Sequence, residues 1–275
     1  MTIKPNLKAV PETMLWTLHN RAVEAMRDDA VIEDDMAVKI YRSIDYDYVK
    51  KFGEAEASHA IRSLDFDRQI RAFLAQYPDA TVVNLGEGLE TQRFRIQAKQ
   101  VTWLSVDLPE AIAIREQFIK PDARYRHIAV SALDRSWFDF VPKNKLVFIT
   151  AQGLFMYFPE QEVKLLLQDI EQAFDDWCLM FDTIPEWIAK KTLSQQGWKK
   201  TETYQTPKMP WGINRNSIVR RLNHWFTAPH DITDLGYSTF PRGFVKWLFL
   251  LFSTMPLLKN ITPTIVRINS QSPQP

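Results

Sequence analysis

The chain has 275 residues, a formal net charge of +1 and 45% hydrophobic residues, which is ordinary for a large globular domain. The balanced charge argues against nucleic acid as a partner, because proteins that bind it present a surplus of basic residues. Cys178 is the only cysteine, so an intramolecular disulfide and a cysteine-based metal site are excluded. The N-terminal residues contain no apolar signal segment, and the longest apolar run, 243–258, is interrupted by Lys246 and too short to span a membrane. We expect a cytoplasmic protein without integral membrane association, in which this run packs as a helix or covers an apolar pocket.

Residues 11–77 have mostly helical periodicity, with apolar residues near helical spacing in 11–26 and again in 64–78. After residue 80, short β-branched or aromatic runs predict strands. The fourth of these runs is followed by a predicted helix over 158–174, which has Pro159 in its first turn and one apolar face. The predicted strands cover 81–85, 101–106, 124–130, 145–150 and 177–181.

Strands that alternate with helices predict crossover connections and a doubly wound, mostly parallel α/β sheet that is covered on both faces, as in Rossmann-like folds. We expect a single domain in three parts. A helical N-terminal cap covers 1–78, a cofactor-binding core covers 79–183, and a C-terminal extension over 184–275 completes the sheet and shapes a pocket. Sheets of this kind bind ligands at the carboxyl ends of their strands.

Two of the eight glycines, Gly86 and Gly88, directly follow the first predicted strand. Glycine has no Cβ atom to collide with a ligand, although a tight turn alone would also explain the pair. The next strand ends at Asp107, 21 residues after Gly86, close to the separation at which a carboxylate meets the ribose hydroxyls of a nucleoside. Asp107 would equally suit a cap of the helix that begins at Pro109. The glycines and the aspartate together indicate a site for a nucleoside cofactor.

The charge of the glycine turn bears on which cofactor binds there. Glu87 and Glu90 lie where a dinucleotide-binding protein presents free amides to a pyrophosphate, and Thr91 stands where its fingerprint has a third small residue. Anionic side chains repel a pyrophosphate but suit the cationic sulfonium of S-adenosylmethionine. The turn therefore favours a methyl donor over NAD.

Six ordered segments, spread over nearly the whole chain, resemble one family. They are similar to the leucine carboxyl methyltransferase family, and within it to a bacterial branch of polyketide O-methyltransferases. The resemblance implies a class I methyltransferase fold and transfer of a methyl group from S-adenosylmethionine to an oxygen, often of a carboxylate. The segments are KAVPETMLWTLHNRAVE, HAIRSLDFDRQIRAFL, VVNLGEGLETQRFRI, SVDLPEAIAIREQF, GLFMYFPEQEV and PKMPWGIN.

The resemblance also implies roles for individual residues. Arg62 and Lys8 pair with the methionine carboxylate of the cofactor, which an arginine can hold with two parallel hydrogen bonds. Gly86 and Gly88 line the methionine portion, and Asp107 holds the ribose. The remaining assignments are Ser131 and Ala132 beside adenine, Gln152 in the place of a family glutamate, and Tyr157 and Trp211 as walls of the acceptor pocket. Both aromatic residues would also suit a hydrophobic core.

The chain departs from the family pattern at the glycine turn. Typical members have a small residue, an aspartate and an arginine where this chain has Glu87, Glu90 and Gln92. Glu87 adds bulk and charge beside the expected ligand path.

The leading hypothesis is an O-methyltransferase acting on a carboxylate or phenolic oxygen of a small, polyketide-like molecule. The alternative is a non-catalytic or regulatory binder of S-adenosylmethionine or S-adenosylhomocysteine with a degenerate site. The histidines show no metal-ligand spacing. No general base stands out either, which favours a carboxylate acceptor, because a carboxylic acid is already ionised at neutral pH.

Overall fold

The structure is a computed structural model that describes residues 4–5, 7, 9–98, 100–143, 145–238, 247 and 255–270. Lys8 lies outside the described residues, and so does most of the apolar run 243–258. The expected contact of Lys8 with a cofactor and the expected packing of that run therefore stay predictions.

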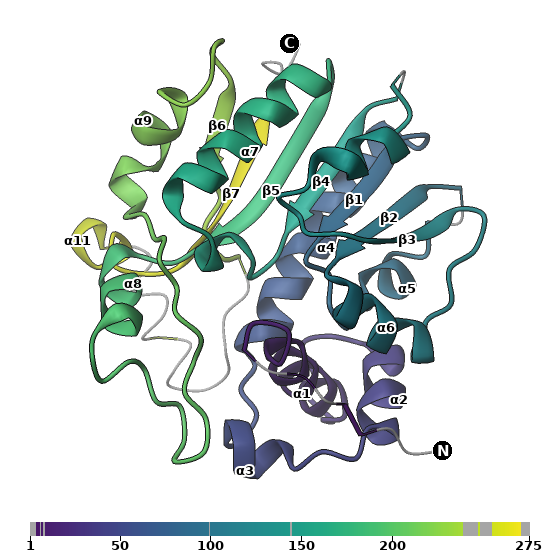
Figure 1. Ribbon diagram of the computed structural model, residues 1–275, viewed down its shortest axis with the longest axis vertical. Coiled ribbons are helices and arrows are strands. Elements are labelled where there is room, and N and C mark those ends of the chain that lie inside the picture. Colours follow the sequence, from purple (N-terminus) through teal and green to yellow (C-terminus); the bar gives the residue numbers. More distant parts are fainter. Residues whose placement is uncertain are drawn as a thin grey trace.

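The N-terminal part of the chain forms helices α1 (Thr13–Ala25), α2 (Asp35–Ser43), α3 (Tyr48–Phe52) and α4 (Ser58–Gln76). The side chains of Asp34 and Asp47 accept hydrogen bonds from the backbone amides of Ala37 and Lys50, so each aspartate caps a helix. In Figure 1, α1, α2 and α3 lie below the sheet, whereas α4 runs from this group up along one face of the sheet.

Seven strands form one sheet in the order β3-β2-β1-β4-β5-β7-β6. The first five strands are parallel, and β7 and β6 join the edge beyond β5 in antiparallel pairings. The order reverses between β1 and β4, which is the point where doubly wound sheets bind their ligands. The strands are β1 (Thr81–Leu85), β2 (Thr102–Asp107), β3 (Tyr125–Ala129), β4 (Val147–Ala151), β5 (Trp177–Thr183), β6 (Asp231–Asp234) and β7 (Thr264–Asn269).

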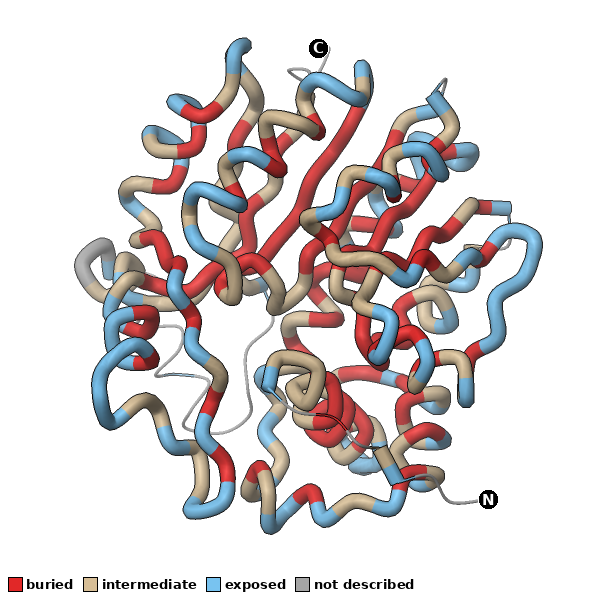
Figure 2. The backbone as a smooth tube through the Cα atoms, in the orientation of Figure 1, coloured by how far each residue is buried: buried red, intermediate tan, exposed pale blue. Residues whose placement is uncertain are grey.

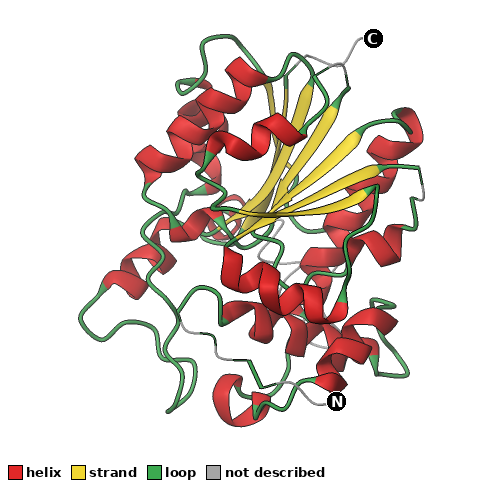
Figure 3. Ribbon diagram, turned by 45° about the vertical axis from the view of Figure 1, so that its right-hand side comes forward, coloured by secondary structure: helices red, strands yellow, loops and turns green. Residues whose placement is uncertain are grey.

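Helices cover both faces of the sheet (Figure 3). Alternate residues of each strand point to opposite faces, so Val82 packs with the N-terminal helices while Val83 packs with α7. The central strands are buried along their length (Figure 2). The remaining helices are α5 (Gln92–Ile96), α6 (Pro109–Phe118), α7 (Glu160–Ala173), α8 (Glu186–Leu193), α9 (Ile218–Asn223) and α11 (Pro256–Lys259), with 3-10 turns η1 (Arg135–Phe140), η2 (Phe155–Tyr157) and η3 (Arg215–Ser217).

The doubly wound, mostly parallel α/β sheet confirms the predicted fold class. The five predicted parallel strands are present, with bounds that differ by a few residues. Strands β6 and β7 were not predicted, because β6 has only four residues and both follow a long irregular segment. No helix in the described part of the chain is long and apolar enough to cross a membrane.

Candidate active site

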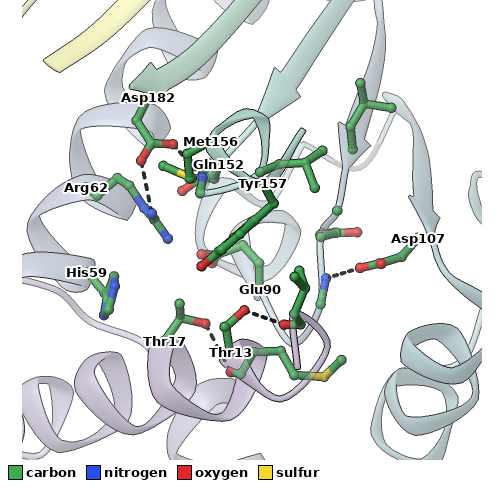
Figure 4. A pocket seen from close by; sticks show the side chains of 18 of the residues that line it. Thr13, Thr17, His59, Arg62, Glu90, Asp107, Gln152, Met156, Tyr157 and Asp182 are labelled. Atoms are coloured by element: carbon green, nitrogen blue, oxygen red, sulfur yellow. Dashed lines mark hydrogen bonds and ion pairs between the residues drawn. The ribbon is translucent and has the colours of Figure 1, made fainter. Parts of the chain in front are cut away.

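A cavity of about 430 Å³ lies at the carboxyl ends of the parallel strands, beside α1 and α4 (Figure 4). Segments that follow each of the five parallel strands contribute to its wall, so it occupies the expected binding crevice of the fold. Most of the residues predicted to contact the cofactor line this single cavity. They are Arg62, Gly86, Gly88, Asp107, Ser131, Ala132 and Gln152, joined by Tyr157, which was predicted to contact the acceptor.

The two glycines of the turn are required by the fold itself. Gly86 and Gly88 have φ angles of +62° and +51°, a region that residues with a Cβ atom rarely adopt. A Cβ on Gly86 would lie 2.7 Å from Leu154 Cδ1, and one on Gly88 would lie 2.9 Å from Met14 Cβ. The glycines were expected to make room for a ligand, but the atoms nearest to an added Cβ belong to side chains of the protein.

Two buried arginines hold the carbonyl groups of this turn. Arg115, from α6, donates hydrogen bonds to the carbonyl oxygens of Gly88 and Glu90 at 2.6 and 2.8 Å. Arg21, from α1, donates to the Leu89 carbonyl at 2.7 Å. Three successive carbonyls are thereby fixed from outside the turn. The glycine turn is consequently a preorganised element, held in place by helices on both of its sides.

The side chain of Glu87 is directed into the protein and is neutralised there. Its carboxylate lies 2.9 Å from Arg115 Nη2, and both side chains are only 1% exposed. Asn84 Nδ2 donates a further hydrogen bond at 3.0 Å, and the Ser105 hydroxyl donates to the other carboxylate oxygen. Glu87 lines the cavity as expected, and the charge that it adds there is compensated by Arg115.

Glu90 is neutralised in a similar way. Its carboxylate lies 2.7 Å from Arg95 Nη1 and 3.3 Å from Arg21 Nη1, and it accepts a hydrogen bond from Ser63 Oγ at 2.8 Å. Burial raises the pKa of Glu90, but the two guanidiniums and the hydroxyl outweigh burial and hold the pKa well below its usual range. The negative charge of the turn was taken to favour a methyl donor because its carboxylates were assumed to be unpaired. That reason fails, and the choice of S-adenosylmethionine rests on the family resemblance.

Arg95 supplies a buried positive charge one helical turn after Gln92, the position at which the family resemblance leads us to expect an arginine. Gln92 is fully buried, and its Nε2 donates to Asp67 Oδ1 at 3.0 Å. Arg95 donates to the same carboxylate from Nε at 2.7 Å and from Nη2 at 3.0 Å. The departure at Gln92 is therefore compensated one helical turn later and does not indicate a degenerate site.

Asp107 lies at the end of β2, where its carboxylate accepts hydrogen bonds from the backbone amides of Gly88 at 2.7 Å and Leu108 at 2.8 Å. Burial raises the pKa of Asp107 to about 6, against the two amides, which lower it. Helix α6 has Leu108 at its N-cap and no side-chain cap hydrogen bond, so the alternative role of Asp107 as a helix cap is not realised. A carboxylate has about four acceptor sites, which leaves two for a ligand.

Arg62 extends from α4 toward the cavity and is held by Asp182 (Figure 4). Its Nη1 lies 3.1 Å from Asp182 Oδ2, and the other oxygen of Asp182 accepts from the Gly153 amide at 2.5 Å. Arg62 Nε is buried and has no hydrogen-bond partner among the described residues. The guanidinium is thus oriented by one carboxylate while part of its donor capacity remains free. Asp182 was missed in the sequence, although an acid at the carboxyl end of a predicted strand is the signal that would have identified it.

The two aromatic residues predicted to form the acceptor pocket occupy different environments. Tyr157 lines the cavity, and burial raises its pKa to about 12. Trp211 is 2% exposed, is absent from the described lining and packs between Phe181 and Trp225 at ring-centre distances of 6.1 and 5.8 Å. The prediction that Trp211 forms a wall of the pocket is corrected to a role in the core.

Apolar side chains that sequence reasoning missed complete the cavity. Met156 follows β4, Ile184 follows β5, and Met209 comes from the irregular segment after α8. The three side chains pack in one cluster that lines the cavity. Met14, Trp16 and Tyr237 add further apolar surface from distant parts of the chain. No local motif marks these positions, because they come together only when the segments after β4 and β5 fold against one another.

The cavity suits S-adenosylmethionine by the chemistry of its unpaired groups. Arg62 offers free donors for a carboxylate, and Asp107 offers free acceptors for the two ribose hydroxyls. Gln152 Oε1 is buried and has no partner in the described part of the chain, so it is available to a ligand donor such as an ammonium group. These groups line the same cavity, which is the arrangement that the cofactor requires.

Comparisons with known proteins identify the family of the chain. The model of the leucine carboxyl methyltransferase family matches residues 14–171. The tetracenomycin polyketide synthesis O-methyltransferase TcmP of Streptomyces glaucescens is 28% identical over 258 residues, which cover 92% of this chain and 94% of that protein. The S-adenosyl-L-methionine-dependent methyltransferase dpfgK of Gibberella zeae is 27% identical over 63% of this chain and 64% of its own length.

Solved structures share the fold at low sequence identity. The plantazolicin methyltransferase BamL, solved in complex with a triazolic desmethylPZN analog and SAH, superposes with a TM-score of 0.51 at 11% identity and covers 94% of this chain and 98% of its own. The fold, the site and the family match lead to one conclusion. The chain belongs to the leucine carboxyl methyltransferase family and is an enzyme that uses S-adenosylmethionine as its methyl donor.

Proposed function

We propose that the enzyme methylates an oxygen of a small, largely apolar or aromatic acceptor, with a polyketide-like carboxylic acid as the preferred class and a phenol as the second. The observation that carries this proposal is the two-part lining of the cavity. Unpaired polar groups gather at the glycine turn and on Arg62, whereas Met156, Ile184 and Met209 form an apolar cluster beside them. TcmP, which is named for polyketide synthesis and is similar over nearly its whole length, supports the same acceptor class.

The division of labour within the chain follows from this lining. We propose that the core over 79–183 holds the cofactor, that the N-terminal helices over 1–78 contribute Arg62 and close the cavity, and that the extension over 184–275 shapes the acceptor side. Ile184 and Met209 support the last assignment, since both lie in the extension and line the cavity.

Positioning is the principal task of these residues. When bound, S-adenosylmethionine supplies a methyl group that is activated by its sulfonium. Asp107 would hold the ribose and Arg62 the methionine carboxylate, so that the middle and the amino-acid end of the cofactor are fixed by groups that the protein has already oriented. The apolar cluster would hold the acceptor with its oxygen about 3 Å from the methyl carbon, as displacement in line requires.

The ionisation state of the acceptor favours a carboxylate. A carboxylic acid is already ionised at neutral pH, whereas a phenol with a pKa near 10 gains from a general base. Tyr157 stays protonated because burial raises its pKa to about 12. Glu87 and Glu90 are bound by arginines, so neither carboxylate is free to remove a proton.

The proposal is tested with S-adenosylmethionine that carries tritium in its methyl group. The enzyme is incubated with matched aromatic acceptors that contain either a carboxylic acid or a phenol, and the products are then treated with alkali. A methyl ester releases its label as methanol, whereas a methyl ether retains it. We expect transfer to the acids and alkali-labile products. Alkali-stable label would assign a phenolic acceptor, and absence of transfer to both classes would refute O-methylation of this group of compounds.

A further inference from the structure

The imidazole of His59 lines the cavity and is held by a buried asparagine. His59 lies in the first turn of α4, and its Nδ1 is 2.8 Å from Nδ2 of Asn20, a residue of α1 that is 1% exposed. The ring also meets Trp16 edge-on, with ring centres 5.2 Å apart and an interplanar angle of 88°. Contacts from two directions therefore fix the orientation of this ring.

The hydrogen bonds of Asn20 determine which nitrogen of His59 carries the proton. Asn20 Oδ1 accepts from the Glu56 backbone amide at 3.3 Å, so its other terminal atom, the Nδ2 donor, faces the imidazole. An amide nitrogen donates only, so Nδ1 of His59 must accept and its Nε2 must carry the hydrogen. No residue in the described part of the chain forms a hydrogen bond with Nε2, which leaves this N–H for a ligand in the cavity.

The surroundings of His59 keep the ring neutral. Burial lowers the pKa of His59 well below its usual range. The positive charges of Arg62 on α4, Arg21 on α1 and Lys200 on the later loop lower it further, and Glu90 in the glycine turn opposes them weakly. His59 is therefore a donor of fixed tautomer and fixed charge at neutral pH.

Arg62 presents its free donor to the same cavity. Residues three positions apart on a helix lie on one face, and Figure 4 shows the His59 ring and the Arg62 guanidinium extending from α4 on the same side of the cavity. Arg62 Nε has no partner among the described residues, and Asp182 already occupies Nη1. One cationic donor and one neutral donor therefore stand side by side. A carboxylate, with two oxygens and about four acceptor sites, is the ligand group that such a pair suits.

We propose that His59 is a second donor to the methionine carboxylate of the cofactor, next to Arg62, and that Asn20 is the residue that positions it by fixing its tautomer. This inference rests on the proposed role of Arg62 in cofactor binding. It assigns a function to one of the five histidines, none of which has metal-ligand spacing in the sequence.

Binding measurements with two nucleosides test the assignment without requiring the acceptor. S-adenosylhomocysteine contains the amino-acid carboxylate, whereas 5′-methylthioadenosine lacks it. Isothermal titration calorimetry is performed with both on the wild type, His59→Phe and His59→Gln. Phenylalanine removes the donor, and we expect S-adenosylhomocysteine to bind on the order of 10-fold more weakly, because a hydrogen bond to a charged group is lost. Binding of 5′-methylthioadenosine should not change, and glutamine, which retains an N–H donor, should restore part of the affinity.

Equal effects of His59→Phe on the two nucleosides, or no effect on either, would overturn the assignment. A wild type that fails to bind S-adenosylhomocysteine would instead refute the cofactor site as a whole, so the two failures can be distinguished. Nitrogen NMR of the histidine-labelled wild type provides a measurement that needs no variant. Between pH 6 and 8 we expect Nε2 of His59 protonated and Nδ1 bare, with the Nε2 proton resonance shifting when S-adenosylhomocysteine is added. The opposite tautomer would contradict the role of Asn20.

Discussion

Replacing Glu87 with alanine, the kind of small residue that typical family members have in the glycine turn, provides the sharpest test of how this chain tolerates its altered motif. The structure pairs Glu87 with Arg115 at 2.9 Å, with both side chains 1% exposed. Glu87→Ala leaves the guanidinium buried without a carboxylate, although its hydrogen bonds to the Gly88 and Glu90 carbonyls remain possible. Breaking a buried pair of this kind costs about 3–5 kcal/mol of unfolding free energy.

A loss of that size is a large part of the roughly 5–15 kcal/mol that stabilises a typical domain. With a shift of about 2–4 °C for each kcal/mol in proteins of similar length, the midpoint of thermal unfolding should fall by roughly 6–20 °C. Affinity for S-adenosylhomocysteine should fall as well, because Arg115 holds the carbonyls of the turn. Both quantities are measured, by differential scanning calorimetry and by isothermal titration calorimetry.

Two further variants make the result specific. Glu202→Ala removes a glutamate from an exposed position and should leave both quantities unchanged. The double variant Glu87→Ala/Arg115→Met also removes the hydrogen bonds of Arg115 to the turn, so its loss of stability should be smaller than the sum of the losses in the two single variants, and the difference measures the coupling of the pair. If Glu87→Ala is as stable as the wild type and binds the nucleoside more tightly, then Glu87 obstructs the ligand and its pairing with Arg115 is not what stabilises the turn.

Three other predictions concern the cavity and its surroundings. Asp107→Ala should weaken S-adenosylhomocysteine binding by about 1–3 kcal/mol. Ribose hydroxyls favour the ionised carboxylate, so wild-type affinity should decline as the pH falls below about 6, and Asp107→Asn should abolish that decline in calorimetric titrations from pH 5 to 8. Gly153→Ala places a Cβ 2.6 Å from Arg62 Nη1 and should weaken nucleoside binding. Gly53→Ala is the control, because Gly53 also has a positive φ but a Cβ there would meet no atom closer than 3.7 Å; equal effects of the two variants would contradict the crowding of Arg62. Trp211→Ala should lower the free energy of unfolding by about 3–5 kcal/mol in urea titrations, and an unchanged free energy of unfolding would contradict its place in the core.

Local patterns in the sequence were sufficient to predict the parallel part of the sheet. Each parallel strand is a short β-branched or aromatic run, and the chain order of strands and helices leaves few possible topologies. Gly86, Gly88 and Asp107 were predicted from the glycine turn and from the 21-residue separation of the aspartate from Gly86, and the structure places all three around one cavity. These inferences need only neighbouring residues and the general rules of doubly wound sheets.

The tertiary structure decided how charges and contacts are paired. Glu87 and Glu90 looked like exposed anions in the sequence, yet their partners come from α1, α5 and α6, up to 69 positions away. Asp182 orients Arg62 across 120 positions, and Asn20 sets the tautomer of His59 across 39. Trp211 and Tyr157 both read as candidate pocket aromatics, and only packing separated the one in the core from the one in the cavity. The pKa of a charged group and the energy of its interactions depend on its burial and its partners, and both are set by contacts between distant segments. Local sequence therefore determines where a site forms but not its electrostatics.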